Sequence, residues 1–144
     1  MNRDALYAVL ANYLEALNAG DASRVNWAAS PLNSENNVML EVGDGLWGTI
    51  LRVGDYQLKF ADMATNQVGY FGTVHEAIEE SAFTLRLKVN DQGQVCESEM
   101  VVVRQSDSGI KFENCRYWDK PILNADVEAP VSRVEMVKLS DGYF

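Results

Sequence analysis

The chain has 144 residues, of which 47% are hydrophobic and 23% are charged. This composition excludes a disordered chain, and the length predicts one compact domain with a sizeable core. No long apolar run is present, so the sequence predicts no membrane span, no secretory signal and no membrane partner. The formal net charge of -9 disfavours nucleic acid as a partner. Two cysteines without metal-ligand spacing favour a reducing, cytoplasmic location and no bound metal.

The first predicted element is an amphipathic helix over residues 2–18. Apolar residues recur there at the spacing of one helix face: Leu6, Val9, Leu10, Tyr13, Leu14 and Leu17. Gly20 is expected to follow this helix in the left-handed conformation. Asp21 is expected to cap a second, short helix over residues 22–29, which Pro31 ends.

The second half of the chain predicts β-strands, because it is rich in β-branched and aromatic residues. The expected strands cover residues 67–76, 82–89, 95–105 and 110–118. Two type I turns, at residues 90–93 and 106–109, join the last three strands, with a glycine in the left-handed bulge position of each. Helices followed by such an antiparallel meander predict an α+β fold with a curved sheet.

The two turns also predict which side chains share a face of the sheet. Closing the first turn between Val89 and Gln94 places Arg86 opposite Glu97. Alternation along the strands then gives one mostly polar face: Thr84, Arg86, Glu97, Glu99, Val101, Asn114, Arg116 and Trp118. The opposite face is apolar: Phe83, Leu85, Leu87, Cys96, Met100, Val102, Cys115 and Tyr117. The charged face is either the polar floor of a pocket or a solvated outer surface.

Two kinds of residue could transfer a proton. His75 is the only histidine, and histidine needs little tuning to accept a proton near neutral pH. Glu97 or Glu99 is the alternative base, provided that burial tunes its carboxyl group. The segment of residues 43–48 matches the glycine pattern of dinucleotide-binding loops, but no parallel βαβ unit follows it. We therefore expect a turn that places Trp47 at a cavity wall, and no bound cofactor.

The segment from Tyr13 to Asp21, YLEALNAGD, resembles the first helix of the nuclear-transport-factor-2-like, or SnoaL-like, superfamily. The order of predicted elements agrees with this superfamily up to about residue 118. The resemblance implies a cone-shaped α+β barrel over residues 1–118, in which a curved antiparallel sheet wraps around N-terminal helices and leaves a pocket. Residues 119–144 are then a C-terminal extension that packs on the domain or on a partner subunit.

The resemblance also implies roles for particular residues. Tyr13 lies close to the tyrosine that polarises the substrate oxygen in the ketosteroid isomerase branch. The aspartate base of that branch falls at Asn37 here, and Glu35 is the nearest carboxylate. A strand histidine serves as base in the scytalone dehydratase branch, which His75 would match, and the polyketide cyclases use a strand carboxylate, which Glu97 or Glu99 could supply.

Together these observations predict a cofactor-independent lyase, dehydratase or isomerase that acts on a small, largely apolar hydroxy or oxo compound. The superfamily includes a diarylpropane lyase branch, so the substrate could be aromatic. Tyr13, Arg86 and Arg116 would stabilise a developing oxyanion. The remaining residues expected to line the substrate pocket are Asn37, Trp47, Tyr56, Asn114 and Trp118. The alternative is a non-catalytic binding or assembly domain, and the apolar face of the sheet predicts a homo-oligomer, most simply a dimer.

Overall fold

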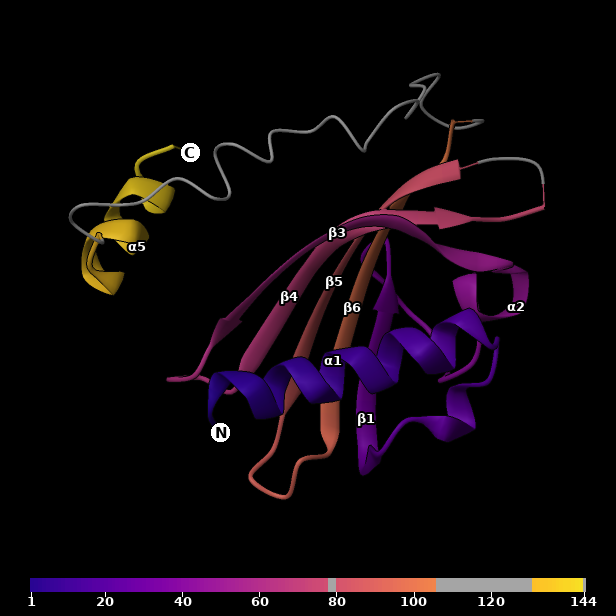
Figure 1. Ribbon diagram of the computed structural model, residues 1–144, viewed down its shortest axis with the longest axis horizontal. Coiled ribbons are helices and arrows are strands. Elements are labelled where there is room, and N and C mark those ends of the chain that lie inside the picture. The colour runs from indigo at the N-terminus through magenta and orange to yellow at the C-terminus, as the bar shows by residue number, and fades with distance from the viewer. Residues whose placement is uncertain (78–79, 106–130, 144) are drawn as a thin grey trace.

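The computed structural model describes residues 1–77, 80–105 and 131–143. Its elements are α1 (Arg3–Asn18), η1 (Ala22–Arg24), β1 (Trp27–Glu35), β2 (Val38–Met39), α2 (Leu46–Thr49), β3 (Arg52–Asp62), β4 (Gln67–His75), β5 (Glu80–Val89), β6 (Val95–Val103) and α5 (Arg133–Asp141). The strands form one six-stranded sheet in the order β2-β1-β6-β5-β4-β3. Figure 1 shows that this sheet is strongly curved and that α1 lies across its concave side. The predicted α+β class is confirmed.

Helix α1 forms the inner layer of the molecule. The Asn2 side chain caps it by accepting a hydrogen bond from Ala5 N at 2.8 Å, and Gly20 follows it with φ +62°. Its buried residues are Leu6, Leu10, Tyr13, Ala16 and Leu17. They join one core with the apolar face of the sheet, which includes Phe83, Leu85, Leu87, Met100 and Val102. Helix α1 covers the apolar face of the sheet, so this face needs no partner subunit to bury it. The apolar face is therefore not the reason to expect an oligomer.

The prediction of a helix over residues 22–29 is wrong beyond the first turn. Asp21 accepts a hydrogen bond from Ser23 N at 3.1 Å, but the helical segment is only η1. Residues 27–35 form β1, which runs parallel to β6, with Leu32 opposite Glu97 and Glu35 opposite Met100. Pairing with β6 outweighs the local helix propensity of the alanines. The inner sheet face therefore receives two polar residues of β1, Asn33 and Glu35, which are both buried.

The sheet also differs from the predicted cone in two respects. It is mixed, because the β1–β6 pair is parallel, whereas the other four pairs are antiparallel. It is not closed into a barrel within the described residues, since β2 and β3 are its two edges. Strand β3 was not predicted, and the strand expected over residues 110–118 lies outside the described residues.

The β5–β6 turn has the predicted chemistry but a different register. Gly93 has φ +76° and its N–H donates to Asn90 O at 3.0 Å, as a type I turn with a glycine bulge requires. The turn closes between Asn90 and Gln94, one residue later than predicted, and a bulge follows. Arg86 therefore lies opposite Glu99, not Glu97. A shift of two residues preserves the side-chain alternation, so the predicted faces of β5 and β6 hold from Glu97 onward. At the bulge Val95, and not the predicted Cys96, takes the core position.

The β1–β2 hairpin is held by Asn36 and Asn37, which have φ +50° and +64°. Two consecutive residues in this region make the tight turn that suits the twist of a two-stranded ribbon. The Asn36 side chain accepts from Val102 N at 2.8 Å and donates to Val102 O at 3.1 Å. The Asn36 amide thus makes the two backbone hydrogen bonds to Val102 that a paired strand residue would make. These bonds anchor the hairpin to β6.

Helix α5 lies within the predicted C-terminal extension, and all of its residues are exposed. Its contact with the rest of the described chain includes an ion pair from Arg133 Nη2 to Asp62 Oδ2 at 2.6 Å. No helix among the described residues is both long enough and apolar enough to cross a membrane.

Candidate functional site

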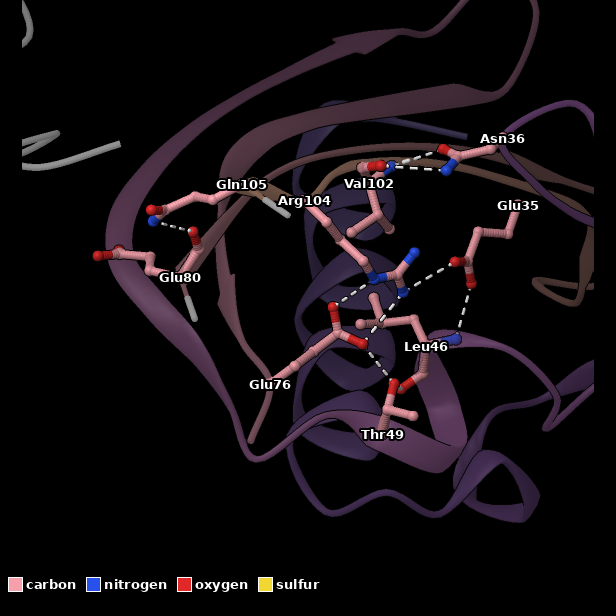
Figure 2. Close-up of polar contacts among 9 residues, drawn as sticks. All are labelled: Glu35, Asn36, Leu46, Thr49, Glu76, Glu80, Val102, Arg104 and Gln105. Atoms are coloured by element: carbon pink, nitrogen blue, oxygen red, sulfur yellow. Dashed lines mark hydrogen bonds and ion pairs between the residues drawn. The ribbon is translucent and has the colours of Figure 1, made fainter. Parts of the chain in front are cut away.

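A buried charge cluster, formed by Glu35, Glu76 and Arg104, lies at one end of the sheet (Figure 2). Arg104 Nη2 lies 3.0 Å from Glu35 Oε1, and Arg104 Nε lies 2.7 Å from Glu76 Oε2. The side chains of Glu35 and Glu76 are 8% and 10% exposed. One guanidinium thus holds two carboxylates away from bulk water, an arrangement in which each charge depends on its partner.

Three separate segments supply the cluster. Glu35 ends β1 on the inner face, Glu76 directly follows β4, and Arg104 directly follows β6. The backbone N–H of Leu46 donates to Glu35 Oε2 at 2.7 Å, so the start of α2 fixes the second carboxylate oxygen. Gly45 makes this approach feasible, because a Cβ atom there would overlap the Glu35 carboxylate.

The electrostatics of the cluster keep Arg104 charged. Burial raises the pKa of Glu76, but hydrogen bonds from Arg104 and Thr49 outweigh it and leave the pKa below its ordinary value. Hydrogen bonding to Glu76 raises the pKa of Arg104, against the opposing effect of burial. Thr49 Oγ1 donates to Glu76 Oε1 at 2.5 Å, which ties α2 to the same cluster.

Tyr13 lies on the same inner side of the sheet. Its hydroxyl forms a buried 2.7 Å hydrogen bond with Ser98 Oγ and lies 3.8 Å from Met100 Sδ. Tyr13 extends from α1 to these two residues of β6, and Met100 is the register partner of Glu35 on β1. Burial raises the pKa of the Tyr13 hydroxyl, and the nearby charge of Glu35 adds to the rise. The phenol is therefore protonated at neutral pH and can act as a hydrogen-bond donor.

Aromatic rings enclose the Tyr13 side chain. Trp47 meets it edge-to-face with ring centroids 5.2 Å apart, and Trp27 meets it at 5.8 Å. Trp47 belongs to the short helix α2 and is only 3% exposed, so it packs in the core beside the predicted oxygen-polarising residue. A protonated phenol and a fixed carboxylate are groups that general acid–base chemistry can use, and the packed rings shield the phenol from water.

The predicted charged residues of the meander lie elsewhere. Arg86 bonds Glu97 at 2.9 Å and Glu99 at 2.8 Å, so the expected hydrogen bonding is confirmed. Their neighbours Leu85 and Met100 are in the core, so alternation puts these three charged side chains on the opposite, outer face. The structure therefore separates Arg86, Glu97 and Glu99 from Tyr13.

The other predicted site residues are also dispersed. His75 Nε2 lies 3.4 Å from Glu80 Oε1, on the side of the chain opposite its neighbour Glu76. Asn37 is an exposed residue of the β1–β2 turn, two positions after the buried Glu35. Tyr56 lies in β3, where its carbonyl accepts a 3.3 Å hydrogen bond from Tyr70. Asn114, Arg116 and Trp118 lie outside the described residues.

Sequence reasoning missed Ser98, Glu76 and Arg104 as members of this site. Ser98 could have been found, because a serine among apolar inward positions of a strand needs a buried partner. Glu76 and Arg104 carried no such signal, because their contact depends on the positions of the ends of β4 and β6 in the folded sheet. Among the described residues, no group of three or more histidine, cysteine, aspartate or glutamate side chains could hold a metal ion.

No family model matches this chain, and no curated protein matches it. Solved structures do resemble it. A protein with a cystatin-like fold from Methylobium petroleophilum aligns at TM-score 0.59 and 12% identity, over 92% of this chain and 97% of that one. An NTF2-like protein from Cytophaga hutchinsonii aligns at TM-score 0.56 and 8% identity, over 73% and 95%. AusH from Aspergillus nidulans aligns at TM-score 0.55 and 15% identity, over 70% and 85%. The chain therefore has the fold of the nuclear-transport-factor-2-like proteins.

Proposed function

We propose that the chain is a cofactor-independent lyase, dehydratase or isomerase that moves a proton on a small, largely apolar hydroxy or oxo compound. In this proposal Glu35 is the proton acceptor. Tyr13 donates a hydrogen bond to the substrate oxygen and stabilises the negative charge that develops there. The cysteine content that predicted a reducing compartment supports a cytoplasmic location.

The observation that carries the proposal is the position of Glu35. Its carboxylate is buried, is fixed by Arg104 and by Leu46 N, and ends β1 opposite Met100, which the Tyr13 hydroxyl contacts. Each carboxylate oxygen accepts one of these hydrogen bonds and retains a further lone pair that can take a proton. Arg104 and Leu46 therefore orient the base without occupying all of its acceptor capacity.

The same reasoning ranks the other bases. Glu97 is engaged by Arg86 and Lys88 on the outer face, whereas Tyr13 is buried on the inner side. His75 pairs with Glu80, which is not a member of the buried charge cluster. Glu35 is the carboxylate nearest to the position at which the isomerase branch of the resembled superfamily carries its base, which further supports this choice.

The experiment measures proton abstraction directly, because no substrate is assumed. Wild-type protein is incubated in D2O with a panel of small cyclic and aryl ketones, and hydrogen exchange beside the carbonyl is followed by NMR. For a ketone that exchanges faster with wild type, Glu35→Gln should lower the enzymatic rate by about 10²-fold or more. Tyr13→Phe should also lower it, because the donor to the oxygen is lost.

Two matched variants make the result decisive. Glu97→Gln removes a carboxylate from the outer face and should leave the exchange rate unchanged. His75→Gln should also leave it unchanged. A large loss in His75→Gln together with a near wild-type rate in Glu35→Gln would overturn the assignment of the base. The absence of any enzymatic exchange across the panel would favour the non-catalytic binding role.

We also propose that two copies of the chain associate through the outer sheet face. Phe60, Phe71 and Val101 are 50%, 44% and 41% exposed there. They line a groove of about 420 Å³, and the rings of Phe60 and Phe71 lie 5.7 Å apart. A contiguous apolar surface of this kind, with Arg86 and Glu99 beside it, suits a protein interface that has an apolar centre and a polar rim.

A further inference from the structure

A second hollow lies between β1 and the residues that follow β2. It is a cleft of about 710 Å³ whose lining includes Trp27, Asn33, Met39, Leu40, Glu41 and Asp44. The buried charge cluster and the outer-face groove share none of these residues, and Trp27 also packs edge-to-face against Tyr13 of the candidate site. The lining combines an aromatic ring, apolar side chains, two acidic residues and one buried amide.

Asn33 is the most informative residue of this lining. It is 1% exposed, and its Nδ2 donates to Glu41 O at 3.2 Å, which fixes the orientation of the amide. Its Oδ1 atom is buried and has no hydrogen-bond partner among the described residues. Buried polar atoms of native proteins are almost always hydrogen-bonded. An amide oxygen can only accept, so the missing partner must be a donor.

The charged residues around the cleft indicate that this donor carries a positive charge. Glu41 and Asp44 are exposed, and no ion pair among the described residues engages either carboxylate. The described lining of the cleft contains no lysine, arginine or histidine. Two uncompensated carboxylates on a chain of net charge -9 attract cations and repel anions.

The aromatic and apolar residues of the cleft indicate what the rest of the ligand is made of. Trp27 offers an aromatic surface, and its indole N–H is already used, since it donates to Ala22 O at 2.8 Å. The ring therefore presents apolar surface, and a cation near an aromatic ring is attracted by the electron density of the ring face. Met39 and Leu40 extend this apolar wall. They favour a ligand whose body is aromatic or aliphatic.

We propose that this cleft binds a small organic cation, namely a protonated amine attached to an aromatic body. The ammonium group donates a hydrogen bond to Asn33 Oδ1 and is attracted by Glu41 and Asp44, and the aromatic body packs against Trp27. This site goes beyond the proposed acid–base function and does not depend on it. Amine binding and proton exchange are measured separately, so the failure of one leaves the other intact.

The test compares three probes that share an indole body and differ in head group: tryptamine, tryptophol and indole-3-propionate. Calorimetric titration of wild type at low ionic strength should show the tightest binding for tryptamine. Its dissociation constant should be lower by about tenfold or more than that of neutral tryptophol. The anionic propionate should bind most weakly.

Three variants assign the site. Asn33→Leu keeps a similar volume but removes the acceptor, and should weaken tryptamine binding by about tenfold. The double variant Glu41→Gln, Asp44→Asn changes only exposed side chains, and should abolish the preference for tryptamine over tryptophol. Glu99→Gln removes a carboxylate from the outer sheet face and should leave both affinities unchanged.

Several results would overturn the proposal. Wild type that does not bind tryptamine at millimolar concentration, or that binds the propionate as tightly, has no such amine site. Wild-type affinity in a folded Asn33→Leu variant would exclude the hydrogen bond. If that variant does not fold, the double variant decides, because an unchanged preference for the cation would remove Glu41 and Asp44 from the site.

Discussion

Arg104 and Glu35 are 69 positions apart in the sequence, and their side chains meet at 3.0 Å in a largely buried position. Removing only the guanidinium would leave Glu35 and Glu76 buried without their cationic partner. We expect Arg104→Met to lower the free energy of unfolding by about 3–5 kcal/mol, the usual cost of breaking a buried ion pair. Urea unfolding followed by circular dichroism measures this loss.

Arg86 provides the matched control for Arg104. It also bonds two carboxylates, but Glu97 and Glu99 are 28% and 48% exposed and can be rehydrated when the arginine is removed. Arg86→Met should therefore cost only about 1 kcal/mol or less. Equal losses of unfolding free energy in Arg104→Met and Arg86→Met would show that burial does not determine how much the Arg104 ion pairs stabilise the fold.

The second prediction concerns pH. Burial raises the pKa of Glu76, but hydrogen bonds from Arg104 and Thr49 lower it more, so that it lies below the ordinary value of 4.5. A carboxyl group whose pKa is lower in the folded state stabilises the fold above its unfolded-state pKa. That contribution is lost as the pH falls through the folded-state pKa. The free energy of unfolding should therefore decrease as the pH falls below about 4.5.

Variants isolate the part of this pH dependence that belongs to Glu76. Glu76→Gln should make the free energy of unfolding less dependent on acid pH, with lower stability than wild type at neutral pH. Glu15→Gln is the control, because Glu15 is an exposed residue of α1, and its pH dependence should match wild type. A Glu76→Gln curve parallel to wild type would contradict the prediction.

The third prediction concerns the buried pair of Tyr13 and Ser98. Tyr13→Phe removes the phenol oxygen and leaves Ser98 Oγ buried without that partner, which should cost about 1–3 kcal/mol. The double variant Tyr13→Phe, Ser98→Ala removes both polar groups. It should be less destabilised than the sum of the two single variants, because no orphaned hydroxyl remains. Thermal or urea unfolding of all four proteins gives this coupling, and strict additivity would disprove it.

The fourth prediction separates two adjacent turn residues. Asn36 and Asn37 both have positive φ, so glycine at either position keeps the backbone conformation and removes only a side chain. Asn36→Gly loses two hydrogen bonds to Val102 and should lower stability by about 1–3 kcal/mol. Asn37→Gly removes an exposed side chain and should stay within about 0.5 kcal/mol of wild type. Similar losses at both positions would show that the amide does not anchor the hairpin.

The fifth prediction tests association through the outer face. Sedimentation velocity of wild type should give a dimer of about 32 kDa, twice the chain mass of 16.0 kDa. Phe71→Lys places a charge in the lining of the apolar groove and should shift the protein to the monomer. Leu51→Lys is the control, because Leu51 is 63% exposed but does not line the groove. A wild-type monomer, or a dimer that persists in Phe71→Lys, would exclude this interface.

Local sequence determined the elements whose signals are local. The helix of residues 3–18 followed from its apolar spacing and from Gly20, and the turn at Gly93 followed from the need for a residue with positive φ. The side-chain alternation of β5 and β6 also followed, because a period of two survives a register shift of two. These features depend on interactions within a few residues, which a single sequence records.

Only the tertiary structure decided which polar residues meet. Residues 27–35 form a strand because β6 is available to pair with them, and this pairing carries Glu35 to the inner face. Helix α1 lies on the concave side and covers the apolar face, so the alternating residues Arg86, Glu97 and Glu99 face outward. Glu35, Glu76 and Arg104 come from three distant segments, and no local pattern encodes their distance. Their meeting depends on strand order and sheet curvature, which arise from burying one apolar face against one helix.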